Sequence, residues 1–140
     1  MTRLWTDDIY ADLLTKLQIT FPNILVVPFS DKNTTLMQCL QCQIGLFSQA
    51  NIVIGMHGAG LANMIFMPPG GLVVEITPQT DGRMLPGTGI FSRLAMSTGI
   101  NHYIHHLSSG ERNFSKRGIS FNVDHLVHSI QVAKARMKLV

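Results

Sequence analysis

Apolar residues recur at helical spacing in several parts of the chain. Near the start, Ile9, Leu13, Leu14 and Leu17 line one face of a predicted helix that Thr6 can cap. The predicted helices run over residues 7–17, from Thr34 or Thr35 to 47, over 61–67, over 90–98, and from a start just after 121–124 to about 138.

Between these helices lie short runs, and in all but the last of them most residues are apolar. They predict buried strands at 24–27, 51–55, 72–76 and 101–107, with loops at 78–89 and 108–117. Apolar strands that alternate with helices indicate a parallel sheet covered on both faces and joined by right-handed connections. The predicted fold is therefore α/β, a Rossmann-like parallel sheet with helices on both faces. Such a sheet binds ligands at the C-terminal edge of its strands, where the order of the strands reverses.

Length and composition narrow the possible functions. The 140 residues suit one domain, 1–140, and the 46% of hydrophobic residues supports a buried core. Only 14% of residues are charged, so we expect some apolar surface to face another domain. The net charge of +3 comes from scattered Lys and Arg, and nucleic-acid binding is not predicted. No apolar run has the length of a membrane span, and residues 1–8 contain no signal-peptide core.

The most distinctive loop follows the strand predicted at 51–55. It reads Gly55-Met56-His57-Gly58-Ala59-Gly60 and leads into a helix that begins near Ala59. Glycine permits positive φ and a close approach of the backbone to a ligand, and a helix start presents unpaired N–H groups. Together these features suit a phosphate or diphosphate. A tight turn needed only for packing explains the loop equally well, and the pattern is not the G-x-G-x-x-G of dinucleotide domains.

Two polar residues near this loop are candidate ligand contacts. His57 lies within the turn and can donate a hydrogen bond to a phosphate or a sugar oxygen, or it can cap a backbone carbonyl. Glu75 interrupts an otherwise apolar strand, where an unpaired carboxylate would be costly. It either holds ribose hydroxyls or accepts N–H groups of a loop.

The cysteines and histidines do not predict a metal or redox centre. Cys39 and Cys42 lie inside a helical pattern without a second ligand pair, so we interpret them as two small, semi-buried side chains. Alternation along the strand at 101–107 places His102 and His106 on one face and His105 on the other. No Asp or Glu joins them at ligand spacing, and a polar strand end is the favoured interpretation.

Taken together, three motifs over positions 43–78 resemble glycosyltransferase family 61. They are Gln43-Ile44-x-Leu46-Phe47-Ser48-x-Ala50, Val53-x-Gly55-x-His57-Gly58-Ala59-Gly60-Leu61-x-Asn63-x-x-Phe66-Met67-x-Pro69-Gly70, and Val73-Val74-Glu75-Ile76-x-Pro78.

The resemblance implies one half of a two-domain GT-B fold, a UDP-sugar donor as substrate, no permanently bound cofactor, and inverting transfer to a hydroxyl of a glycan or protein acceptor. By motif, His57 and 58–60 would contact the diphosphate, Asn63 follows in the first helical turn, and Glu75 would contact the ribose or uracil side. By the resemblance, an arginine-rich segment would lie just upstream of the first helix, and an N-terminal half before it would supply the acceptor site and catalytic base. No catalytic residue is therefore assigned in this chain.

Family members act in the lumen of the secretory pathway, the Golgi or the endoplasmic reticulum. Two N-x-S/T triplets, Asn33-Thr34-Thr35 and Asn113-Phe114-Ser115, fall in predicted loops and agree with that location. Two other functions stay open at this point. One is a degenerate or non-catalytic nucleotide-binding module, and the other is an unrelated Rossmann domain that binds a dinucleotide, since Glu75 lies near the spacing of an acidic ribose ligand.

Overall fold

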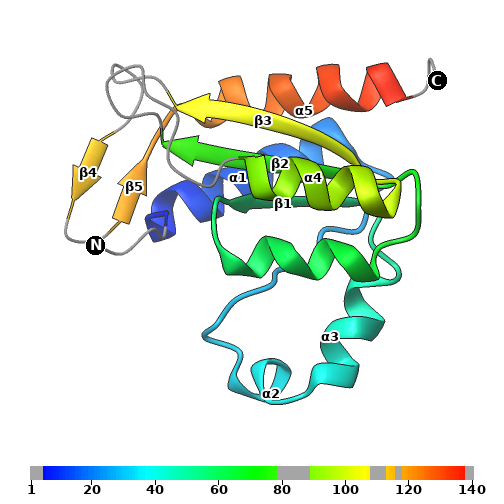
Figure 1. Cartoon of the computed structure of the whole chain (residues 1–140). Helices are drawn as coiled ribbons and strands as arrows, with labels where there is room; N and C mark the ends of the chain where they lie inside the picture. Colours follow the sequence, from blue (N-terminus) through cyan, green and yellow to red (C-terminus); the bar gives the residue numbers. More distant parts are fainter. Residues whose placement is uncertain (1–4, 79–88, 108–112, 116–117, 138–140) are drawn as a thin grey trace.

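The computed structural model, shown in Figure 1, describes residues 5–78, 89–107, 113–115 and 118–137. Its centre is a parallel sheet of three strands, which lie in the order β1-β2-β3. The strands are β1 (Ile52–Met56), β2 (Leu72–Pro78) and β3 (Asn101–Leu107). The predicted α/β fold, with a parallel sheet between helices, is confirmed.

Side chains of β2 alternate between two separate apolar cores, one on each face of the sheet. Leu72, Val74 and Ile76 pack against α1 (Asp7–Thr20) and α5 (Val123–Met137). Val73 packs on the opposite face with residues of α3 (Leu40–Phe47), η1 (Ala59–Phe66) and α4 (Gly89–Thr98). Glu75 and Thr77 share that second face because side chains alternate along a strand. The alternation thus points a buried carboxylate toward η1 and α4.

Three of the predicted helices are confirmed. Thr6 caps α1, and its hydroxyl accepts a hydrogen bond from the Ile9 N–H at 3.4 Å. This helix continues to Thr20, three residues beyond the prediction. Helix α4 begins one residue earlier than predicted and is followed by Gly99 at φ +71°, a left-handed conformation that glycine adopts readily at a helix end. Helix α5 is the third.

The predicted strand at 24–27 is wrong. This segment pairs with no strand among the described residues, and its side chains are packed on one side only. Leu25 and Val27 are 85% and 50% exposed, whereas Val26 packs against the core beneath α1 and α5. A β-branched run becomes a strand only where another strand accepts its hydrogen bonds, and β1 lies at the edge of the described sheet without such a partner.

The helix predicted from Thr34 or Thr35 to 47 is two helices, α2 (Thr34–Met37) and α3, separated at Gln38 and Cys39. Helix α2 begins at Thr34, as predicted, and Asn33 caps it. Cys39 caps α3 and forms a disulfide with Cys42, which corrects our interpretation of two unlinked side chains. The two cysteines approach because residues three apart lie on one side of a helical turn, and their Cα atoms are 5.1 Å apart.

Two further differences concern short elements. Residues 59–66 form a 3₁₀ helix, η1, which begins two residues before the helix predicted at 61–67. The loop predicted at 108–117 contains β4 (Asn113–Ser115), which pairs antiparallel with β5 (Gly118–Ser120). Most of the loop predicted at 78–89, and the remainder of the one at 108–117, lie outside the described residues.

The three described strands follow one another in space as they do in sequence. The predicted reversal of strand order is therefore not found among them. Gly55 of β1 is in register with Glu75 of β2, which in turn is in register with Ile104 of β3. This alignment brings the C-terminal ends of β1 and β2 together, beside the glycine loop.

Candidate functional site

The glycine loop begins where β1 ends. The N–H of His57 donates to the carbonyl of Ile76 at 2.8 Å, which extends the pairing of β1 with β2 by one residue. Gly58 then caps η1, and its carbonyl accepts from the N–H of Leu61 at 3.1 Å. Leu61 is only 4% exposed, so a buried side chain anchors the start of the helix. The backbone of the loop is thus held by the sheet on one side and by the core on the other.

The glycines of this loop do not adopt the positive φ that we expected. Gly58 is extended, with φ 168°, and the positive-φ glycines found among the described residues lie elsewhere, at 70, 99 and 118. A Cβ at Gly60 would meet nothing within 4 Å, and one at Gly58 would meet only the Met56 carbonyl, at 3.8 Å. These glycines leave open space beside an exposed backbone, which is the condition for close approach of a ligand.

The backbone N–H groups of Gly58, Ala59 and Gly60 have no hydrogen-bond acceptor in the part of the chain that the structure describes. Ala59 and Gly60 are also exposed. Unpaired N–H groups at the start of a helix carry partial positive charge and attract anions. The loop therefore presents a row of donors at the C-terminal edge of the sheet.

Next to the loop, a buried carboxylate joins two histidines from different elements. Glu75 is 0% exposed. Its Oε1 is hydrogen-bonded to Nδ1 of His57, and its Oε2 lies 2.7 Å from Nε2 of His102 on β3. Burial by itself raises the pKa of Glu75, but the hydrogen bonds from His102 and His57 outweigh it, and the pKa lies below its ordinary value. Glu75 is therefore a carboxylate, and it accepts both bonds.

This assignment determines which ring nitrogens carry hydrogen. Because Glu75 only accepts, Nδ1 of His57 and Nε2 of His102 must both be protonated. The other nitrogen of His102, Nδ1, lies 2.9 Å from Oγ of Ser92 on α4 and accepts its hydroxyl hydrogen when the ring is neutral. The ring of His57 also makes an edge contact with Phe91, at 5.4 Å between ring centres. The imidazole of His57 is thus held from two sides.

Of the predicted site residues, the structure brings together His57 and Glu75 and places 58–60 beside them. Asn63 lies further along η1, half-buried and without a hydrogen bond among the described residues. Sequence reasoning missed His102 and Ser92. The sequence did contain a signal for His102, because strand alternation places it on the same face of the sheet as Glu75. That signal becomes useful only once the register of β2 and β3 is known.

The other histidines of β3 belong to local packing. Nδ1 of His106 lies 2.8 Å from the hydroxyl of Thr77, whereas Nδ1 of His105 lies 2.9 Å from the hydroxyl of Ser129 on the opposite face. The predicted alternation of these histidines is confirmed. Within residues that the structure describes, no group of three or more His, Cys, Asp or Glu is arranged to hold a metal ion.

Two other observations concern parts of the molecule outside the loop. A shallow hollow lies at the opposite, N-terminal end of β2 and β3, where Leu72, Asn101 and Arg136 contribute to its walls. It does not adjoin the glycine loop, and we do not assign it to the site. Over the described ranges, every helix is too short or too polar to cross a bilayer.

Comparison with known families supports the resemblance noted from the motifs. The family model described as Glycosyltransferase 61 matches residues 10–74. A search of curated proteins finds no matching relative. The matched segment runs from α1 to the third residue of β2 and contains the whole glycine loop, ending immediately before Glu75. Residues 10–74, with the glycine loop near their C-terminal end, are thus similar to glycosyltransferase family 61.

Proposed function

We propose that this domain binds the diphosphate of a UDP-sugar at the Gly55–Gly60 loop and serves inverting transfer of the sugar to a hydroxyl acceptor. One observation carries the proposal. The unpaired N–H groups of 58–60 lie at the end of β1, inside the segment that matches the family, and beside the buried His57–Glu75 pair. Free N–H groups, open space and a nearby imidazole suit an anionic ligand.

His57 would act through its second ring nitrogen. Its Nδ1 is committed to Glu75, and no partner is found for Nε2 among the described residues. When the ring is neutral, Nε2 is an acceptor and would repel a phosphate oxygen. When the ring is protonated, Nε2 becomes a donor, and the buried carboxylate balances the positive charge. A hydrogen bond from Nε2 to a diphosphate oxygen therefore requires hydrogen on both ring nitrogens of His57.

We propose a role for Glu75 that differs from the expected contact with the ribose or the uracil. A direct contact with the ribose or the uracil stays a prediction, but both oxygens already accept from histidines and the side chain has no exposed surface. We assign Glu75 as a positioning residue, which fixes the orientation and protonation pattern of His57. His102 and Ser92 would hold the other side of this carboxylate.

The proposed reaction is a single displacement at the anomeric carbon. The acceptor oxygen forms a bond to that carbon while the bond to UDP breaks, and the electron pair leaves on the β-phosphate. The N–H groups of 58–60 and protonated His57 would stabilise this charge as it develops. The acceptor hydroxyl loses its proton to a base that we expect, from the family resemblance, on a second half of the enzyme.

The test is titration of the purified chain with UDP, and separately with GDP and NAD, by calorimetry and thermal unfolding. UDP at one hundred times its Kd should stabilise the fold by about 2.7 kcal/mol, with smaller effects of GDP and NAD. His57→Gln should weaken UDP binding, whereas His128→Gln, on the exposed face of α5, should not. A folded chain that shows neither heat of binding nor stabilisation with UDP would refute donor binding. Stabilisation by NAD alone would indicate a dinucleotide domain instead.

A further inference from the structure

A protruding corner of the molecule carries features that donor binding does not use. It is formed by α2 and α3, and Figure 1 shows α2 at the end of the fold farthest from β3 and α5. The segment 31–35, which leads into α2, is exposed at every residue. A turn closes just before it, where the N–H of Asn33 donates to the carbonyl of Ser30 at 3.0 Å. The Asn33-Thr34-Thr35 triplet therefore lies at the exposed start of α2, with Asn33 as the cap and both threonines in the helix.

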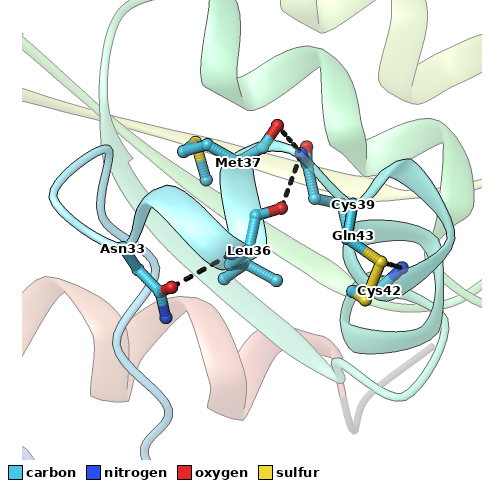
Figure 2. Close-up of a disulfide and its surroundings, with 6 residues drawn as sticks. All are labelled: Asn33, Leu36, Met37, Cys39, Cys42 and Gln43. Carbon is cyan, nitrogen blue, oxygen red and sulfur yellow. Dashed lines mark hydrogen bonds between the residues drawn. A yellow bond between two sulfur atoms is a disulfide. The ribbon is translucent and has the colours of Figure 1, made fainter.

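The side chain of Asn33 is oriented by its oxygen and leaves its nitrogen available. Oδ1 accepts a hydrogen bond from the Leu36 N–H at 3.0 Å, and this caps α2. Figure 2 shows this bond and the amide nitrogen turned away from the helix. Nδ2 donates to no group among the described residues, and the hydroxyl of Thr35 has no partner there either. Attachment at Nδ2 would keep the capping oxygen in place.

The same corner holds the disulfide between Cys39 and Cys42, which Figure 2 also shows. Cys42 is exposed and Cys39 half-buried, so reductants can reach the pair. Gln43 fixes the corner further, because its Nε2 donates to the carbonyls of Leu36 and Met37, both at 3.1 Å. An accessible disulfide of this kind persists in an oxidising compartment and is reduced in the cytosol. The two observations, sequon and disulfide, point independently to the secretory lumen.

We propose that Asn33 is a site of N-glycosylation and that this face of the domain is exposed to the endoplasmic reticulum lumen. The co-reactant is an oligosaccharide carried on a polyprenyl diphosphate, transferred by the cell's own oligosaccharyltransferase. Nδ2 loses one proton and bonds to the anomeric carbon, while the sugar–phosphate bond breaks and its electron pair leaves with the lipid diphosphate. The glycan projects from α2 into solvent, so the glycine loop stays accessible and donor binding is unaffected.

The experiment follows the modification in eukaryotic cells, with the chain expressed behind a cleavable export leader. Cleavage of the leader shows that the chain has entered the lumen. The exported chain should lose mass on treatment with peptide-N-glycosidase, and in ¹⁸O-water the released Asn33 should appear as ¹⁸O-labelled aspartate. Asn113→Gln is included in every variant so that the shift reports on Asn33 alone.

The sequon offers matched controls. Thr35→Ala should abolish the mass shift, Thr35→Ser should restore it, and Thr34→Ala should leave it intact, although Thr34 and Thr35 are both exposed. Donor binding by these variants should match the parent, so failure of this proposal is distinguishable from failure of the proposed function. Leader-cleaved chain with unmodified Asn33, or a shift that survives Thr35→Ala, would overturn the proposal.

Discussion

Replacing Glu75 by glutamine would keep the shape of a fully buried side chain and remove the charge that two imidazoles share. The oxygen of the new side chain can still accept from Nδ1 of His57. Its amide group would donate to Nε2 of His102 if that ring moves its hydrogen to Nδ1 and donates to Ser92 in turn. The substitution therefore preserves the number of hydrogen bonds and isolates the contribution of the charge.

The expected change in unfolding free energy follows from the two hydrogen bonds to the carboxylate and from the cost of burying its charge. A hydrogen bond to a charged group contributes about 1.5–3 kcal/mol and a neutral one about 0.5–1.5, so two bonds lose about 2–3 kcal/mol. Glutamine carries no charge, so the cost of burying a carboxylate disappears, and this offsets part of the loss. Because the pKa of Glu75 lies below its ordinary value, the folded state still favours the charged form over the neutral one. We expect Glu75→Gln to destabilise the fold by about 1–2 kcal/mol near pH 7.

The pH dependence has a definite sign. A carboxylate with a lowered pKa contributes stability that is fully present above its unfolded-state pKa and is lost as pH falls through the folded-state pKa. The difference in unfolding free energy between the wild-type chain and Glu75→Gln should therefore shrink as pH falls below the ordinary pKa of glutamate. Protonated Glu75 and glutamine are then nearly equivalent.

Urea unfolding followed by circular dichroism measures this difference, and a midpoint shift of about 0.5–1 M is expected. Val73→Ala is the matched control, because Val73 lies on the same face of β2, is 0% exposed, and has a side chain without a titratable group or a hydrogen bond. Its effect should stay constant over the acidic range. Equal stability of Glu75→Gln and wild type at pH 7, or a difference that grows on acidification, would refute the assignment of a charged Glu75.

Three further predictions concern the start of β2, the glycine loop and the first helix. Gly71→Ala should destabilise the fold by about 1–3 kcal/mol in urea, since its Cβ would lie 3.2 Å from the carbonyl oxygen of Pro68 as well as 2.9 Å from Cε of Met67; a neutral effect would contradict this packing. Gly60→Ala, whose Cβ meets nothing within 4 Å, should change stability by less than about 0.5 kcal/mol yet weaken UDP binding in calorimetry, and unchanged affinity would remove Gly60 from the site. Thr6→Ala should cost about 1 kcal/mol by loss of the cap, and Thr6→Ser should recover most of it.

Local patterns predicted much of the fold because the forces behind them act between near neighbours. The cap at Thr6 and the apolar spacing of 9–17 identify α1 without reference to the rest of the chain. The strands 52–56, 72–78 and 101–107 differ from prediction by no more than two residues at either end. Burial on both faces leaves such segments few alternatives to a parallel sheet.

The errors fall where the outcome depends on a distant partner. The segment 24–27 has the composition of a strand, but pairing, not composition, decides whether a strand forms. The break at Gln38 and Cys39 has no glycine or proline to signal it, and the disulfide and the bonds from Gln43 accompany it in the structure. The interpretation of the cysteines as unlinked followed directly from treating 34–47 as one helix.

The sequence alone determined the α/β class, the glycine loop at the end of a strand, and the candidates His57, Glu75 and 58–60. These depend on residue type and on spacings of a few positions. Only the tertiary structure decided that both oxygens of Glu75 bind histidines, 18 and 27 residues away, because strand register sets which side chains meet across a sheet. The same register places His102, one of three histidines on β3, within hydrogen-bonding distance of Glu75 in the candidate site.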